Sequence, residues 1–419
     1  MSSGAVYKIS EIPGFNNLLI ENNDTDSTTL KLCKTNVVTR NNQQYKVIRY
    51  DKYFLSVDLI PKYGLLRSVI INGNNKVVSF APPKSFPWDN FIKDNPIKTN
   101  SIRAEEFIEG TMINIFWDPT AGLSGAWEIS TRNSVGGEVS FYKTKDSKTF
   151  RSMFLEAAEC NNFDLSILNP RFCYSFVLQH PNNRIVVPFK NPELFLVEVF
   201  EICNTEGGVT NVISVSLEKI KKMNFLSETT IRFPEIYEEW ESYDDLKKKY
   251  ASMNTSYDIL GIIVRNINNG TRTKIRNPVY ENVRQLRGNQ PKLQFQYLTL
   301  RKNGSISSFL NYYPEYKKEF SFFRKCLHDF TFALYENYIS CYIKKEKPLI
   351  EYPENFRTHM FHIHKKYIDE LKPNNLYVTN SVVIKYVNDM ESTLQMYSIN
   401  YNMRKRSQDF YKIEHEEDD

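Results

Sequence analysis

Three closely spaced histidines could bind a metal ion. They are His359, His362 and His364. Imidazole nitrogens are common metal ligands, but on one helix residues 359 and 362 share a face while residue 364 points elsewhere. Because no nearby carboxylate or cysteine completes a ligand set, we expect a surface cluster of helix histidines and no metal site.

Basic side chains alternate with aromatic ones in residues 316–325, 342–347 and 401–406. Cations and aromatic rings together suit RNA, which is bound through its phosphates and by stacking. Aromatic residues at helical spacing are more often core residues, so RNA binding and helix packing both stay open for these segments.

A second basic series lies earlier in the chain, beginning at Lys274 and Arg276. Arg284, Arg287 and Lys292 extend it toward the expected domain junction. A polyanion needs clustered positive charge, so these last three residues are candidate RNA-binding residues.

The most informative motif lies at residues 107–113, which read Phe-Ile-Glu-Gly-Thr-Met-Ile. Nucleotidyl-transferring ligases share Lys-x-(Asp/Glu)-Gly-(Ser/Thr)-(Leu/Ile/Met), and only the lysine is missing here. No second Lys-x-(Asp/Glu)-Gly occurs in the chain. Five further elements surround the motif: Arg67-Ser68 followed by a hairpin and Lys84, Thr131-Arg132-Asn133-Ser134, Phe176-Val177 followed by Pro-Asn-Asn-Arg-Ile-Val at 181–186, Leu260-Gly261 before an apolar strand, and Lys274-Ile275-Arg276.

On these six elements, in this order within about residues 60–290, the chain resembles the phage-type ATP-dependent RNA ligases. In that family the lysine attacks the α-phosphorus of ATP and carries AMP as a phosphoamide. The resemblance implies that Phe107 replaces this lysine. It also implies that Val177 replaces a glutamate that contacts the nucleotide sugar, and that Leu260 replaces a glutamate that helps to bind the metal ion. We therefore expect no catalytic residue and no metal ligand at these positions, because an apolar side chain offers Mg²⁺ no oxygen.

The resemblance further implies that Arg67, Lys84, Glu109, Lys274 and Arg276 bind nucleotide or phosphate. ATP and Mg²⁺ are cofactors only if this pocket is retained, and the Phe107 ring could fill the adenosine side. The alternative is that these residues are ordinary surface charges. A relocated nucleophile such as Lys84 is a further alternative, which the strict geometry of in-line transfer disfavours.

Three functions follow from these residues. The first is a catalytically inactive RNA ligase-like protein that binds RNA or nucleotide, or serves as a scaffold with protein partners. The second is an active ATP-dependent RNA ligase or nucleotidyltransferase with a relocated nucleophile. The third is a structural, virion-associated protein, for which a large DNA virus is the expected source.

The elements that must position these residues predict an α+β protein with antiparallel sheets. We expect strands at 69–71, 76–80, 111–117, 127–131, 173–178, 184–187, 195–202 and 262–265, and a helix at 237–251. From residue 313 onward the spacing becomes helical, with helices at 320–338, 356–371 and 382–397. The predicted domains are a ligase-like nucleotidyltransferase domain at 1–295, an all-helical domain at 296–405, and a polar acidic tail at 406–419.

Composition fits an ordinary folded protein: 419 residues, 41% hydrophobic, 25% charged, and a net charge of +5. The six cysteines include no CxxC pair, and we expect them to be reduced core thiols. We see no signal peptide and no apolar run of the roughly 18 residues that span a bilayer. The expectation is therefore a soluble protein without a membrane partner, in the cytoplasm, or in the host cytoplasm or virion if it is viral.

Overall fold

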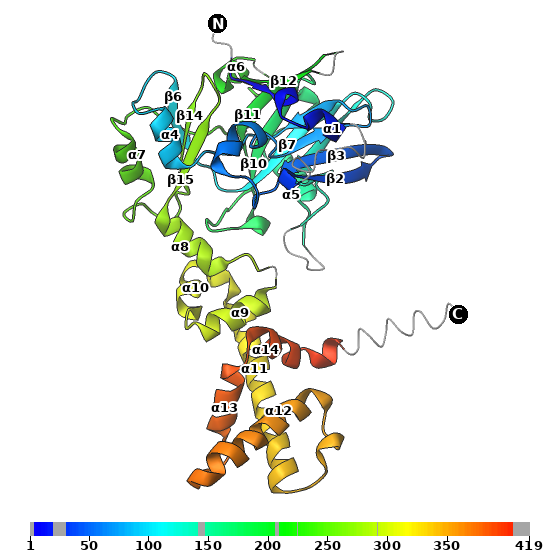
Figure 1. Ribbon diagram of the computed structural model, residues 1–419, viewed down its shortest axis with the longest axis vertical. Coiled ribbons are helices and arrows are strands. Elements are labelled where there is room, and N and C mark those ends of the chain that lie inside the picture. The colour runs from blue at the N-terminus through cyan, green and yellow to red at the C-terminus, as the bar shows by residue number, and fades with distance from the viewer. Residues whose placement is uncertain are drawn as a thin grey trace, which may run out of the picture. The chain divides into compact units, whose positions relative to one another are not determined.

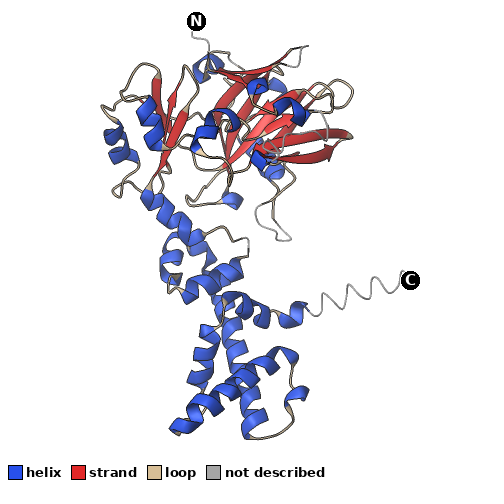
Figure 2. Ribbon diagram, viewed as in Figure 1, coloured by secondary structure: helices blue, strands red, loops and turns tan. Residues whose placement is uncertain are grey.

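The chain forms two compact units, Met1–Arg284 and Gln285–Asp419. The computed structural model describes residues 4–19, 31–140, 147–205, 209–223, 225–290 and 292–404. All strands among these residues lie in the first unit, and the second unit is helical (Figure 2). The predicted α+β class with a helical C-terminal region is confirmed. The units divide inside helix α8 (Pro278–Arg287), whereas the sequence placed the boundary at residue 295. The predicted tail at 406–419 lies outside the described residues.

Three sheets build the first unit, and every pairing between their strands is antiparallel (Figure 1). The largest has the order β1 (Val6–Lys8), β12 (Thr210–Val215), β11 (Glu193–Asn204), β10 (Phe172–Gln179), β7 (Thr111–Asp118), β8 (Ala126–Thr131) and β9 (Ser134–Val135). The second has the order β13 (Ile236–Tyr237), β6 (Ile102–Glu106), β14 (Gly261–Asn266) and β15 (Arg272–Arg276). The third has the order β2 (Cys33–Arg40), β3 (Gln43–Tyr50), β4 (Val69–Ile71) and β5 (Val77–Phe80).

Short helices flank the sheets of the first unit: α1 (Phe15–Leu19), α3 (Ile60–Tyr63), α4 (Trp88–Asp94), α5 (Phe150–Cys160), α6 (Leu217–Lys221) and α7 (Tyr243–Tyr250). Thr149 is the N-cap of α5, and its side chain accepts a hydrogen bond from the backbone N–H of Ser152. The helix expected at 237–251 is shorter, because Ile236–Tyr237 pairs as a strand with β6.

One predicted strand is wrong. Residues 184–187 form no strand, and the turn before them is a single 3-10 turn at Pro181–Asn183. The apolar run Ile-Val-Val suggested a strand, but the backbone N–H groups of Val186 and Val187 donate to the side chain of Glu109 instead of to a neighbouring strand. The other predicted strands are present within one or two residues of their expected bounds.

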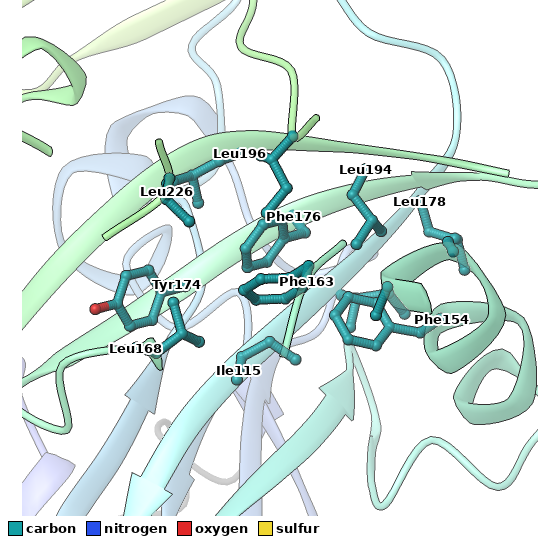
Figure 3. Packing of buried hydrophobic residues seen from close by; sticks show 14 of the residues in the cluster. Ile115, Phe154, Phe163, Leu168, Tyr174, Phe176, Leu178, Leu194, Leu196 and Leu226 are labelled. Atoms are coloured by element: carbon teal, nitrogen blue, oxygen red, sulfur yellow. The ribbon is translucent and has the colours of Figure 1, made fainter. Parts of the chain in front are cut away.

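The main core lies between the seven-stranded sheet and α5. In Figure 3, Phe154 of α5, Phe163 and Phe176 of β10 meet at the centre of this core. The ring centroids of Phe163 and Phe176 are 5.5 Å apart, and those of Phe154 and Phe176 are 6.0 Å apart at 69°. The Phe154–Phe176 pair is edge-on, and such ring contacts add to the apolar burial that holds α5 on the sheet.

The second unit contains α9 (Leu293–Lys302), α10 (Ile306–Tyr312), α11 (Lys317–Tyr338), α12 (Glu354–Lys366), α13 (Asn380–Asp389) and α14 (Ser392–Ile399). The apolar residues of α11 recur every three or four positions, and Phe320, Leu327, Phe330, Leu334 and Tyr338 are all buried. The helix expected at 382–397 is two helices, separated at Met390 and Glu391.

Two expectations from composition can be compared with the structure. No helix of the described segments is both long and apolar enough to cross a bilayer. All six cysteines are free thiols, but only Cys33 and Cys173 are buried, and Cys160 is exposed. The expectation that all six are core thiols is therefore wrong.

The glycine at the start of β14 has no room for a side chain. Gly261 has φ +139°, and a Cβ there would lie 2.0 Å from the carbonyl oxygen of Ile275 on β15. Gly122 also has a positive φ, +67°, but nothing lies within 4 Å of a Cβ placed on it. The tight pairing of β14 with β15 therefore requires glycine for steric as well as backbone reasons.

We predict that Gly261→Ala destabilises the first unit by roughly 2–4 kcal/mol, whereas Gly122→Ala costs about 1–2 kcal/mol, the backbone penalty alone. Urea unfolding followed by tryptophan fluorescence measures this, because Trp88, Trp117, Trp127 and Trp240 all lie in the first unit. Equal losses in the two variants would show that β15 moves aside at no cost.

Candidate functional site

A pocket opens where the chain crosses from the second sheet, which contains β6, to the seven-stranded sheet, which contains β7. Strand β6 ends at Glu106, β7 begins at Thr111, and the crossing segment between them forms part of the wall. The cavity has a volume of about 260 Å³. It brings together eight of the residues singled out from the sequence: Arg67, Phe107, Glu109, Val177, Leu260, Lys274, Arg276 and Arg284. These residues are far apart in the sequence, and their roles stay predictions.

Lys274 is the central cation of the pocket. It lies on β15, is half-buried, and its Nζ is 5.2 Å from the centroid of the Phe107 ring. Burial lowers the pKa of Lys274 to about 7, and the nearby charges of Arg67, Arg276, Arg272 and Lys84 lower it in the same direction. Among the described residues, no carboxylate forms an ion pair with it. A half-buried ammonium group without a carboxylate is an expected partner for an anion.

Arg67 contributes a second cation with little compensation. It lies just before β4, and its Nη1 donates a long hydrogen bond of 3.5 Å to the carbonyl oxygen of Pro82. Burial lowers the pKa of Arg67, and so does the charge of Arg132. The guanidinium remains charged because its ordinary pKa is above 12.

Lys84 does not line this pocket. It lines a different cavity of about 360 Å³, together with Tyr7 and Ile60. Burial lowers the pKa of Lys84, with smaller effects from Arg67 and Arg132, so Lys84 belongs to the same region of positive potential.

Apolar side chains line the pocket at the three positions where the resemblance implies a nucleophile or a carboxylate. Val177 and Leu260 are buried, and Phe107 is half-buried. Val177 packs with Ile108 and Phe195 in a small hydrophobic cluster, which Met112 and Val197 extend. This side of the pocket therefore offers van der Waals contact, whereas the side around Lys274 offers charge.

Glu109 supports the pocket wall. Its carboxylate accepts hydrogen bonds from the backbone N–H of Val186 at 2.8 Å and of Val187 at 3.1 Å, and from the hydroxyl of Tyr280. Burial raises the pKa of Glu109, and these bonds lower it. Because both oxygens are engaged within the chain, Glu109 has little capacity left for a ligand.

Three of the four remaining predicted basic residues have local partners. Arg276 and Arg284 both pair with Glu281, at 3.1 and 3.5 Å. Arg287 is buried, and its guanidinium lies 5.3 Å from the ring centroid of Tyr316 in the helical unit. Lys292 is exposed just before α9. The buried position of Arg287 disagrees with its proposed role in contacting RNA.

Sequence reasoning missed a buried ion-pair network that lines the pocket. Arg265 of β14 pairs with Glu105 of β6, and also with Glu198 of β11 at 2.5 Å. Arg272 of β15 lies 3.6 Å from Glu198 and donates two hydrogen bonds to the carbonyl oxygen of Pro83. Burial lowers the pKa of Arg272 to about 10, whereas Glu105 and Glu198 raise that of Arg265. No local motif marks these residues, because their partners lie on other strands.

The histidine cluster is not a surface feature throughout. His359 is buried, with its Nδ1 3.0 Å from the Tyr386 hydroxyl and its Nε2 3.0 Å from the Ser398 hydroxyl. These contacts join α12 to α13 and α14, so the expectation of a surface cluster is wrong for His359. Within the described parts of the chain, no group of three or more His, Cys, Asp or Glu side chains is placed to hold a metal ion.

The pocket does not fit the magnesium ion that the resemblance implies. Mg²⁺ takes hard oxygen ligands, usually one or two carboxylates. Val177 and Leu260 supply none, and the carboxylates of Glu105, Glu109 and Glu198 are engaged with Arg265, Tyr280 or backbone N–H groups. Glu106, which accepts one hydrogen bond of 3.3 Å from a backbone N–H, is left as a single carboxylate.

Comparisons with known proteins agree with the resemblance seen in the sequence. No family model matches the chain. An RNA ligase of Rhodothermus phage RM378 is 24% identical in an alignment of 286 residues, and the match covers 59% of this chain and 58% of the phage protein. The match thus spans little more than half of that relative.

Solved structures of ligases are also similar, at low scores. A putative ATP-dependent DNA ligase from Aquifex aeolicus has a TM-score of 0.36 and 15% identity, covering 82% of this chain and 79% of that one. A Naegleria gruberi RNA ligase with ATP and Mn has a TM-score of 0.33 and 10% identity, covering 49% and 57%. The sequence match agrees with the resemblance carried by the motifs: the chain is similar to a phage RNA ligase over more than half of its length.

Proposed function

We propose that this chain is an RNA ligase-like protein that binds the phosphate of a nucleotide or RNA end and does not transfer AMP. The observation that carries the proposal is the half-buried Lys274 ammonium, which lies near Arg67 and Arg272 with no carboxylate partner among the described residues. Desolvating a cation without a partner costs free energy. A phosphate would offset that cost by accepting charge-assisted hydrogen bonds.

The loss of transfer chemistry is inferred from the wall opposite Lys274. Phe107 has no nucleophilic atom, and Val177 and Leu260 supply no carboxylate for a metal ion. RNA is the proposed source of the phosphate because the matched phage protein is an RNA ligase. The helical unit supports this source, since exposed Lys317, Lys318, Lys344 and Lys345 give its surface positive charge.

A second candidate function rests on one specific observation. With a pKa of about 7, a substantial fraction of Lys274 carries a neutral amine at neutral pH. A neutral lysine amine can attack the α-phosphorus of ATP. Bound triphosphate, however, would favour the protonated form and raise that pKa, which opposes attack.

The first prediction separates these two functions. The purified protein incubated with α-labelled ATP and Mg²⁺ or Mn²⁺ should give no covalent AMP band on denaturing electrophoresis. Reversible binding of ATP or RNA should be detected on the same sample. A band that disappears in Lys274→Met would support the second candidate and exclude the first.

The second prediction tests whether Lys274 is a ligand-binding residue or a structural one. Lys274→Met should raise the free energy of unfolding at pH 7 by roughly 1–2 kcal/mol, because it removes a half-buried cation. The lowered pKa corresponds to about 1.4 kcal/mol per pKa unit, and the expected gain is smaller than that conversion because the side chain is partly hydrated. The same substitution should weaken phosphate binding by about tenfold or more. A lysine that stabilises the fold would give a loss of stability on substitution.

The pH dependence of this stability gain has a defined sign. The pKa of Lys274 is about 7 in the folded state and near 10.4 in the unfolded chain. The unfolded state therefore binds more protons between these values, and the penalty from Lys274 declines as pH rises through this window. Urea unfolding of both proteins at pH 7 and pH 10 should show the advantage of Lys274→Met shrinking, whereas the exposed control Lys247→Met should differ little from wild type at either pH.

A further inference from the structure

Each carboxylate that lines the pocket already has a partner. Glu105 and Glu198 pair with Arg265, and Glu109 accepts hydrogen bonds from Val186 and Val187. Glu106 accepts a hydrogen bond from the backbone N–H of Glu235 at 3.3 Å. A divalent cation would have to break buried ion pairs or to bind through Glu106 alone, and one carboxylate is a poor site for it.

The pocket cations have the opposite character. Lys274 faces the Phe107 ring and Arg67 faces a backbone carbonyl at 3.5 Å, and neither interaction supplies a negative charge. Repulsion among Arg67, Arg272, Arg276 and Lys274 lowers the pKa of Lys274 beyond the effect of burial. A metal cation brought into this region would add to that repulsion, whereas a phosphate would relieve it.

Two apolar residues remove the places where a metal-bound phosphate would otherwise be anchored. Val177 packs in the hydrophobic cluster with Ile108 and Phe195. Leu260, just before β14, is 7% exposed. Their contact with a ligand is limited to its apolar parts.

We propose that the pocket binds the phosphate end of a nucleotide directly through Lys274 and Arg67, without a divalent cation. This inference rests on the proposed function and specifies how the phosphate is held. The Phe107 ring, with Val177 and Leu260, forms the apolar wall against which the sugar or base lies.

The dimensions of the pocket favour a phosphate end over a whole nucleotide. The cavity of about 260 Å³ is below the range of about 300–1,000 Å³ in which pockets enclose a drug-sized ligand. The rest of the molecule then extends out of the cavity. Free nucleotides and the terminal phosphate of RNA share this chemistry.

The test compares binding in EDTA with binding in Mg²⁺. Two probes are titrated into the full chain: ATP, and a short oligoribonucleotide carrying either a 5′-phosphate or a 5′-hydroxyl. We expect Kd to be unchanged or higher in Mg²⁺, because the metal ion neutralises part of the phosphate charge that Lys274 and Arg67 recognise. A preference for the 5′-phosphorylated RNA over ATP would identify an RNA end as the source, and the reverse would identify a free nucleotide.

A matched pair of variants sharpens the comparison. Leu260→Glu introduces a carboxylate facing the cations, and Leu260→Gln introduces the same shape without charge. In EDTA, Leu260→Glu should bind the probes about tenfold more weakly than Leu260→Gln, or about 1.4 kcal/mol. Added Mg²⁺ should restore much of the loss in Leu260→Glu alone.

The possible failures can be told apart. Binding by the wild-type protein that is about tenfold tighter in Mg²⁺ than in EDTA would overturn direct, metal-free binding and leave the proposed function standing. Absence of binding for every probe in both media would overturn the proposed function itself. The wild-type comparison does not depend on either variant folding, and the melting temperature of each variant shows whether its result can be used.

Discussion

The candidate site depends on the paired charges of Arg265 and Glu198. Arg265 belongs to the sheet of β13, β6, β14 and β15, and Glu198 belongs to the seven-stranded sheet, so their 2.5 Å contact joins the two sheets that line the pocket. Glu105 completes the pairing from β6, and Arg272 adds a longer contact of 3.6 Å from β15. Breaking a buried pair by removing one partner typically costs about 3–5 kcal/mol, and these two sheets form the pocket walls.

The network also explains why the positive charges of Lys274 and Arg67 have no carboxylate beside them. Glu105 and Glu198 are paired with Arg265, so they cannot neutralise Lys274 or Arg67. Glu109 accepts hydrogen bonds from Val186, Val187 and Tyr280 and is likewise engaged within the chain. These pocket carboxylates thus stabilise the walls of the pocket. The cations facing the cavity are left to be neutralised by something that enters it.

The family resemblance carried by the short motifs selected distant residues that meet in the structure, with the exception of Lys84, which lines a different cavity. Arg67, Phe107, Val177, Leu260 and Lys274 were chosen from the sequence, and all five line one pocket. Two glycines account for part of this success: a Cβ on Gly110 would lie 2.4 Å from the carbonyl oxygen of Leu178, and one on Gly261 would lie 2.0 Å from that of Ile275. Motifs that contain such glycines specify a close approach of two strands and therefore identify a place in the fold.

What the sequence did not reveal depends on partners from other strands. Arg265 and Glu198 lie on ordinary strand patterns, and only the packing of two sheets makes them a pair. The strand predicted at 184–187 failed for a related reason, since the carboxylate of Glu109 takes the N–H groups that a neighbouring strand would have used. Arg287 looked like part of a basic surface, but its guanidinium lies over Tyr316 inside the helical unit. In each case local sequence predicts the residue's type of interaction and not the group that satisfies it.

The retained motif residues therefore do not all argue for the same function. Glu109 and Gly110 belong to the best-matched motif, yet the contacts of Glu109 with Val186 and Val187 and the lack of space beside Gly110 account for their presence by packing alone. A protein that had lost every ligand would still need them to keep its walls. Lys274 is different, because packing does not require a half-buried ammonium group whose neighbours are cations and a phenyl ring. Its cost to the fold is the physical reason for assigning a bound anion to this pocket.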